Sequence, residues 1–204
     1  MQVKDLEIIP HVDHSKNARD HGASAKYKGE DCRVVDYTGP LAKRSNGFNL
    51  ILQDLELCLK FADLPYDQPA IIQSAIHRAL VITYGKCFAK ADGRGTKLEA
   101  RHVFKDTDSK LVAYHDLLIK TRNDFVAHSG SDDFEDSHVK VVLPPESEPD
   151  LQPCMLHAAR SLRNFSPQNM TFVVQTIQHV KSYTEERLKQ CGELIKKQVL
   201  SELK

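Results

Sequence analysis

Residues 166–203 carry a helical pattern long enough to constrain the whole fold. Ser166 provides a helix cap and Pro167 suits the first helical turn. Apolar side chains then recur in steps of three and four, interrupted by Thr184: Val173, Ile177, Val180, Leu188, Cys191, Ile195 and Val199. At roughly 1.5 Å per residue this helix spans about 50 Å, longer than a compact bundle of this size requires. We therefore predict a mainly α-helical bundle, in which part of this helix packs on a second copy or on the N-terminal arm.

Two further helices precede it. Apolar residues at helical spacing predict the first over residues 48–64, ended by Pro65. Asp67 and Pro69 predict the start of the second, which continues to Phe88. Because the second is apolar around most of its circumference, we expect it to be the central and most buried helix.

A third helical pattern starts near Asp106 and ends in residues 120–130, KTRNDFVAHSG. We expect Asp106 or Thr107 to cap it. On a wheel of 100° per residue, Arg122 and His115 fall near the middle of the apolar arc. A guanidinium there is costly unless it is paired or borders a wet cleft. Arg122 would therefore either bond a carboxylate on another helix or line a site.

Two groups of residues accompany Arg122. Asp124 precedes His128 by four residues, so both lie on one face near the helix end. The helix dipole alone favours a histidine there, so His128 could also be a simple cap. His77 and Tyr84 lie one heptad apart on the preceding helix and could reach the same cleft; a core histidine and a packing tyrosine are the alternatives.

The sequence of residues 122–129, RNDFVAHS, together with His115-Asp116-Leu117-Leu118 upstream, resembles the signature of HEPN domains. The resemblance covers about residues 76–130 and is closest to bacterial abortive-infection-type HEPN proteins. It implies a HEPN-like bundle of four or five helices. Many members of that superfamily are metal-independent endoribonucleases, and others have no activity.

The resemblance implies an endoribonuclease that cleaves RNA by attack of the 2′-hydroxyl and leaves 2′,3′-cyclic phosphate ends. Arg122, His128 and Asn123 would be its catalytic residues, with Asp124, His115, Tyr84 and His77 in support. Asp124 would raise the pKa of His128 if the two side chains face each other, yet its charge also opposes phosphate.

The resemblance also implies partners. It predicts a homodimer, RNA or a nucleotide as ligand, no cofactor and no metal, and a role as a toxin or in phage defence, with an antitoxin-like protein as a further partner. Two other functions remain open on the residues alone. One is a module that binds RNA or nucleotide through Arg122 and His115 without cleavage. The other is a dimeric interaction module in which a buried Arg122 fixes the register.

The remaining segments carry weaker patterns. Residues 1–45 are predicted as a partly irregular N-terminal arm and residues 46–204 as the bundle. Within the arm, residues 32–37 form either a short strand or a segment laid across the bundle. In the arm His11, Asp13, His14 and His21 could suggest a metal site, but a solvated arm is the better interpretation because no firm scaffold is evident. Apolar β-type residues and turn signals predict a β-hairpin inserted at about 138–160.

Composition sets outer bounds. Formal net charge is zero with 27% charged residues, which argues against a protein that coats nucleic acid by charge alone. Five scattered cysteines lack zinc-site spacing; Cys58, Cys87 and Cys191 lie in helical patterns, where they serve as small apolar residues. We expect no signal peptide and no membrane span, and hence a cytoplasmic protein.

Overall fold

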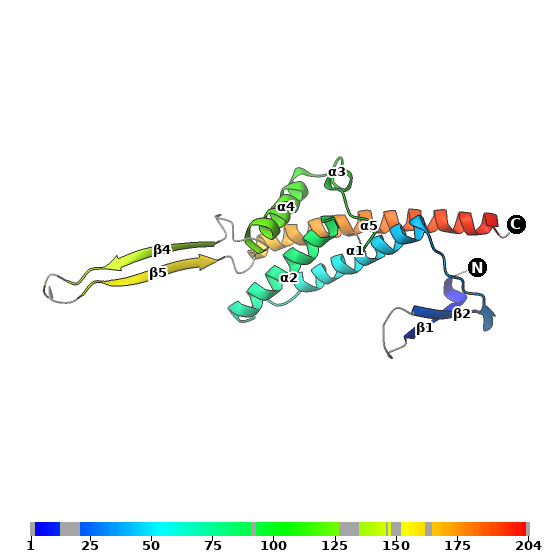
Figure 1. Ribbon diagram of the computed structural model, residues 1–204, viewed down its shortest axis with the longest axis horizontal. Coiled ribbons are helices and arrows are strands. Elements are labelled where there is room, and N and C mark those ends of the chain that lie inside the picture. Colours follow the sequence, from blue (N-terminus) through cyan, green and yellow to red (C-terminus); the bar gives the residue numbers. More distant parts are fainter. Residues whose placement is uncertain are drawn as a thin grey trace. The chain divides into compact units, whose positions relative to one another are not determined.

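The computed structural model describes residues 3–12, 21–90, 93–126, 135–145, 147, 152–161 and 165–202. The chain divides into two units, Met1–Gly39 and Pro40–Lys204. The described residues are mainly α-helical, as the sequence predicts, and contain two small antiparallel sheets, of which the sequence predicts only the hairpin (Figure 1). None of the helices in the described ranges combines the length and the apolar character needed to cross a bilayer.

The N-terminal unit contains a small sheet that was not predicted, followed by residues 33–39, which belong to neither a helix nor a strand. After a 3₁₀ turn, Val3–Asp5, strands β1 (Leu6–Val12), β2 (His21–Tyr27) and β3 (Glu30–Cys32) pair in that order. The strand considered for residues 32–37 therefore ends at its first residue. The register explains the sheet: Ile8, Ala25 and Cys32 align on one face, and Glu7, Lys26 and Asp31 on the other.

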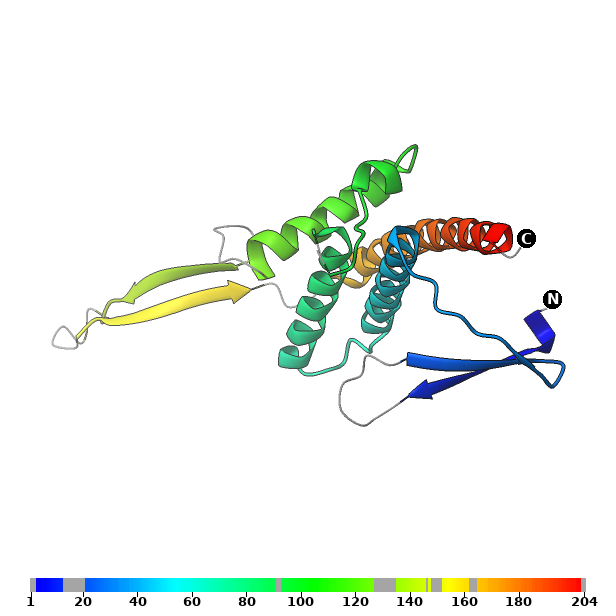
Figure 2. The same ribbon diagram turned by 45° about the vertical axis from the view of Figure 1, so that its right-hand side comes forward.

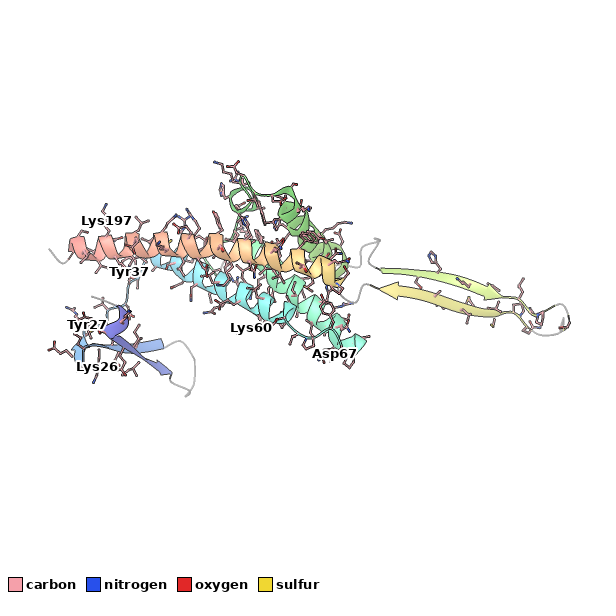
Figure 3. The ribbon with its side chains drawn as sticks, turned by 180° about the vertical axis from the view of Figure 1, so that it is seen from behind. Lys26, Tyr27, Tyr37, Lys60, Asp67 and Lys197 are labelled. Atoms are coloured by element: carbon pink, nitrogen blue, oxygen red, sulfur yellow. The ribbon has the colours of Figure 1, made fainter. Side chains whose placement is uncertain are left out.

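The second unit is built on four helices that pack side by side: α1 (Pro40–Ala62), α2 (Ala70–Phe88), α4 (Ser109–Lys120) and α5 (Pro167–Glu202) (Figure 2). A short helix, α3 (Ala100–Val103), lies between α2 and α4 in sequence. Lys60, in the last turn of α1, and Asp67, before α2, are labelled in Figure 3. Side chains from the helices fill one core, listed by their largest fully buried members: Tyr84, Ile51, Leu55, Leu80, Leu118 and Ile177.

Helix α1 begins eight residues before its predicted start at residue 48. Pro40 suits a first helical turn. The first turns of α1 were not predicted because Gly47 weakens the helical pattern. In the structure this glycine makes room for the segment that contains Arg94. A Cβ at Gly47 would lie 2.4 Å from the carbonyl oxygen of Arg94. Arg94 in turn forms an ion pair with Asp54 of α1, which also pairs with Lys86.

Helix α2 has the largest share of buried residues among α1, α2, α4 and α5, as predicted, with six of its 19 residues buried, but one side of it is exposed. Ile71, Ile72 and Ile82 are 75%, 43% and 48% exposed. One side of α2 packs on α1, α4 and the segment after α4, while the opposite side has no cover within the described chain. Helix α2 is therefore apolar on its exposed side as well as on its packed side.

The predicted hairpin and long final helix are confirmed. Strands β4 (Glu135–Val142) and β5 (Cys154–Ser161) pair antiparallel over their full length. Helix α5 begins at Pro167 as predicted, and its seam is buried as far as Cys191. Leu194 and Leu200 beyond it are 55% and 62% exposed. The three cysteines predicted to be core residues are buried and free, and burial raises the pKa of the Cys87 thiol to about 12.

Candidate functional site

A π-helical segment, η2 (Thr121–Val126), continues directly from α4 and carries Arg122, Asn123 and Asp124. The transition occurs at Thr121, whose side chain is fully buried and donates a hydrogen bond from Oγ1 to the Leu117 carbonyl at 2.7 Å. A π turn contains more residues than an α turn, so it shifts every later side chain from the regular wheel. Such turns occur frequently at functional sites. The direction of Arg122 thus depends on local geometry that a 100° wheel does not contain.

Helix α4 itself starts later than predicted. Asp108 is its cap and accepts a hydrogen bond from the Lys110 backbone N–H at 2.8 Å. Asp106, predicted as the cap, has a φ of 55° and belongs to the turn before it. The error is small because Asp106 and Asp108 are equally good capping residues by type.

Arg122 crosses α2 at Gly85. A Cβ at Gly85 would lie 2.6 Å from Cδ of Arg122 and 3.1 Å from its Cγ. Glycine is therefore the residue that lets the arginine stem pass this close to α2. Gly85 was not among the predicted site residues; its signal in the sequence is a glycine in the interior of a strong helix, where it costs about 1 kcal/mol relative to alanine.

The guanidinium of Arg122 is half-buried and has a neutral partner. Its Nη1 donates to Oδ1 of Asn123 at 2.9 Å. Within the described part of the chain, no ion pair joins Arg122 to a carboxylate. Among the described residues, Arg122 therefore does not bond a carboxylate on another helix, which was one of the two alternatives. A half-buried guanidinium whose partner among the described residues is one amide oxygen retains donors for an anion.

Tyr84 and His115 form a buried pair next to this crossing. The Tyr84 hydroxyl lies 2.8 Å from Nδ1 of His115, and both residues are buried. Burial lowers the pKa of His115 and raises the pKa of Tyr84 well above its ordinary value. A neutral imidazole that accepts from the tyrosine hydroxyl satisfies both groups.

Aromatic rings enclose this pair. The rings of Phe88 and Phe104 lie 4.5 and 4.7 Å from the imidazole of His115, centroid to centroid. Because Tyr84 precedes Gly85 and His115 lies seven residues before Arg122, the pair holds α4 on α2 beside the Arg122 crossing. Tyr84 and His115 therefore position the crossing and are enclosed away from solvent.

His77 is placed in the core. It is 1% exposed, and neither ring nitrogen has a hydrogen-bond partner among the described residues. Its ring meets the ring of Phe165 edge-on at 4.6 Å. Burial, with a smaller contribution from Arg78, lowers its pKa to about 4. The structure thus brings His115, Tyr84, Arg122 and Asn123 to one part of the bundle and places His77 in a packing role.

Two predicted residues complete the set. Asp124 is half-buried in η2 together with Arg122 and Asn123. His128, predicted as the catalytic imidazole, lies outside the described residues, as do Asp13 and His14 of the considered metal site. The described residues contain no group of three His, Cys, Asp or Glu side chains that could hold a metal ion.

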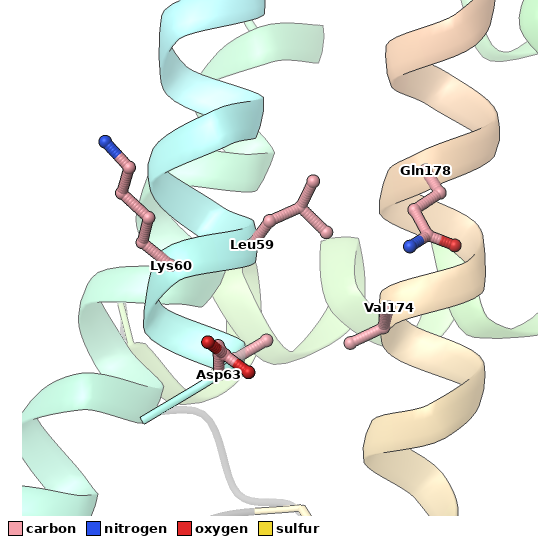
Figure 4. A pocket seen from close by; sticks show the side chains of 6 residues that line it. Leu59, Lys60, Asp63, Val174 and Gln178 are labelled. Carbon is pink, nitrogen blue, oxygen red and sulfur yellow. The ribbon is translucent and has the colours of Figure 1, made fainter. Parts of the chain in front are cut away.

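A separate shallow groove lies between α1 and α5 (Figure 4). Leu59 and Val174 face each other across it, and Lys60, Asp63 and Gln178 form its rim. Its volume is about 350 Å³. None of the residues predicted for the site lines this groove, and its rim charges are one of each sign, so it selects no clear class of ligand.

Comparison with protein-family models, with curated proteins and with solved structures found no match for this chain.

Proposed function

We propose that this protein is a HEPN-type endoribonuclease, a metal-independent enzyme that cleaves RNA by attack of its own 2′-hydroxyl. The observation that carries the proposal is the placement of Arg122. Its stem passes over Gly85, its guanidinium is half-buried, and its described partner is the neutral Asn123. Arginine in that setting suits a phosphate, because its planar fork can donate two parallel hydrogen bonds to one phosphoryl group.

In the proposed reaction Arg122 holds the scissile phosphate and stabilises the charge that builds on its non-bridging oxygens. The 2′-hydroxyl loses its proton to a base and its oxygen attacks phosphorus. The bond from phosphorus to the 5′-oxygen breaks, and the leaving 5′-oxygen gains a proton from an acid. His128 would take the first proton or supply the second. Asn123 keeps Arg122 oriented, and the Tyr84–His115 pair holds α4 against α2. The products are a 2′,3′-cyclic phosphate and a free 5′-hydroxyl.

A second candidate is a protein that binds RNA or nucleotide without cleaving it. The observation that favours it is Asp124, a carboxylate two residues from Arg122 in the same π-helical segment. A negative charge there weakens the stabilisation of a phosphorane more than it weakens one phosphate contact. In this candidate Arg122 alone binds the ligand, since His115 is occupied by Tyr84.

The test incubates the purified protein with RNA in the presence of a chelator and scores the ends of the products. Wild type should yield 2′,3′-cyclic phosphate ends, and His128→Ala should lose at least about 100-fold in rate, the usual contribution of a general acid or base. His102→Ala is the matched control, because His102 is exposed on α3. Equal loss in both variants, or cleavage that persists in His128→Ala, would contradict the proposal. Binding without cleavage by wild type would support the second candidate.

A further inference from the structure

The connection between α1 and α2 exposes a cluster of apolar side chains. Leu64 and Tyr66 in the connection are 43% and 39% exposed, and Ile71 and Ile72 in the first turn of α2 are 75% and 43% exposed. We call residues 63–72, of which nine are exposed, the tip. Exposed apolar residues that gather in one segment and have a polar rim are typical of an interaction site.

Hydrogen bonds fix the shape of the tip without a partner. The side-chain amide of Gln73 donates from Nε2 to the carbonyl oxygens of Tyr66, at 2.6 Å, and of Gln68, at 2.8 Å. The Ile72 backbone N–H donates to the Pro69 carbonyl at 2.8 Å. A surface that is already ordered loses less conformational entropy when it binds, and this loss is one of the main costs of association. The tip therefore presents its apolar side chains in a preformed arrangement.

Two adjoining hollows lie beside the tip. The first is the groove between α1 and α5 (Figure 4). The second has a volume of about 430 Å³ and is lined by Tyr66 of the tip and by residues of α5, among them Met170 and Val174. Val174 lines both hollows, which together follow α5 from Pro167 to Gln178. At about 1.5 Å per residue this is roughly 16 Å, the length of three turns of a helix.

Charge on this surface is sparse and mainly negative. Asp63 and Asp67 are both exposed, and among the residues that the structure describes no cation pairs with either carboxylate. Lys60 is the only basic residue between positions 59 and 77, and residues 167–178 of α5 have no charge. The groove alone selects no class of ligand, but the tip adds a second carboxylate and a larger apolar area. The whole surface therefore matches a partner that is apolar and basic.

We propose that the tip and the two hollows bind a basic amphipathic helix of another protein. Apolar side chains one turn apart on that helix fill the hollows beside Val174 and cover the tip, as in other complexes where a helix lies in a groove. Lysine or arginine side chains at the edge of the apolar face lie near Asp63 and Asp67. The inference goes beyond the ribonuclease proposal and does not depend on it.

The same two carboxylates disfavour the other occupants. Two tips that meet in a pair of identical copies bring Asp63 and Asp67 close to the same residues of the second copy, and like charges repel. An anionic bilayer repels them in the same way, whereas peripheral membrane helices are rich in basic residues. A basic helix is the occupant that gains from both the apolar area and the charge.

The test titrates the full chain into a fluorescently labelled synthetic peptide and measures the anisotropy. The probe has about 18 residues, with leucine on one helical face and lysine on the other, and a second peptide has glutamate in place of lysine. The lysine peptide should bind at least about tenfold more tightly than the glutamate peptide. The difference should shrink at high ionic strength, because salt screens exposed charges.

Variants of the chain locate the binding surface. Tyr66→Ser and Asp67→Lys should each weaken binding of the lysine peptide by at least about tenfold, and Asp67→Lys should strengthen binding of the glutamate peptide. Ile82→Ser is the matched control for the apolar change, since Ile82 is 48% exposed on α2 outside the tip. Asp116→Lys, at an exposed position of α4, is the control for the charge change. Both controls should stay within about threefold of wild type.

Three results would overturn the proposal. The first is equal affinity for the two peptides, or no binding of either. The second is a pair of tip variants that bind the lysine peptide as well as the controls do. The third is self-association or binding to phospholipid vesicles that Tyr66→Ser abolishes while the lysine peptide does not bind, because this would assign the tip to a second copy or to a bilayer.

Discussion

The helices and the strands of this protein differ in where their stability comes from. All buried residues identified in the described chain lie between Ala42 and Cys191, and none belongs to a described strand. The helices bury Ile51, Leu55 and Ile177 against one another. The N-terminal sheet and the β4–β5 hairpin are held by backbone pairing, with Ile8 62% and Val141 60% exposed. The helices bury a core against one another and leave one side of α2 exposed, whereas the described strands contribute no buried residue.

Core truncation should break this comparison most strongly. Leu118→Ala removes a fully buried side chain from α4 and should lower the free energy of unfolding by 2–5 kcal/mol, about the usual range for such a change. Leu143→Ala removes a side chain that is 71% exposed and should change it by less than about 0.5 kcal/mol in the monomer. Urea titration at low protein concentration measures both. Similar losses in the two variants would contradict the contrast.

The buried histidine of the core should make stability depend on pH. The pKa of His77 falls from 6.5 to about 4 on folding, so the unfolded chain binds the proton more readily. Stability from this residue is therefore complete above pH 6.5 and is lost as the pH falls toward 4, by about 3 kcal/mol in total. His77→Phe keeps a ring beside Phe165 and removes the titration.

The measurement is the difference between the unfolding free energies of wild type and His77→Phe at several pH values. That difference should change in favour of the variant below pH 6.5 and stay constant above it. A difference independent of pH between 7 and 4 would show that His77 is not buried as a neutral ring.

Glycine substitutions sharpen the comparison within the helices. Gly47→Ala places a Cβ against the backbone of Arg94 and should destabilise by 1–3 kcal/mol, about the cost of overpacking. Gly192→Ala meets nothing within 4 Å in α5 and should stabilise by about 0.5–1 kcal/mol through helix propensity. Thermal unfolding checks both signs. A stabilising Gly47→Ala would mean that the Arg94 segment does not rest on α1.

Gly85→Ala should have a small effect on stability and a large one on function. The gain in helix propensity, about 1 kcal/mol, offsets the displacement of the Arg122 stem. We expect the unfolding free energy to stay within about 1 kcal/mol of wild type, while RNA cleavage or binding falls because the guanidinium moves. Unfolding and RNA assays on the same preparation separate the two effects. Full RNA activity in Gly85→Ala would show that the crossing does not position Arg122.

The sequence predicted the parts of the fold that depend on local pattern. The proline starts of α2 and α5, the end of α1 near Pro65 and the paired strands of the hairpin follow from residue types at fixed offsets. The start of α1 was not predicted. Gly47 weakens the helical pattern there, and the reason for this glycine is its contact with Arg94, far away in the sequence. The N-terminal sheet was missed because Pro10 interrupts the apolar run of β1 and because β2, HGASAKY, consists mainly of small and polar residues with little apolar periodicity.

The candidate site was predictable only in its residue types. The apolar arc identified Arg122 and His115 as unusual, and the heptad spacing brought Tyr84 into consideration. Three features were beyond the pattern: the π turn at Thr121, the crossing at Gly85, and the pairing that occupies His115. Each depends on contacts between residues more than 30 positions apart, or on a register change inside a helix. A wheel drawn at a constant angle represents neither.

The most direct test of the proposed function is the single-turnover rate of RNA cleavage in chelator by Arg122→Ala, compared with Arg101→Ala. Arg101 is exposed on α3, so its replacement removes an equal charge without touching η2. Arg122→Ala should be at least about 100-fold slower than wild type while it stays folded, in line with the loss of one oxyanion-stabilising donor, and Arg101→Ala should match wild type. Cleavage by Arg122→Ala at the wild-type rate, or no cleavage by wild type at all, would contradict the role assigned to this arginine.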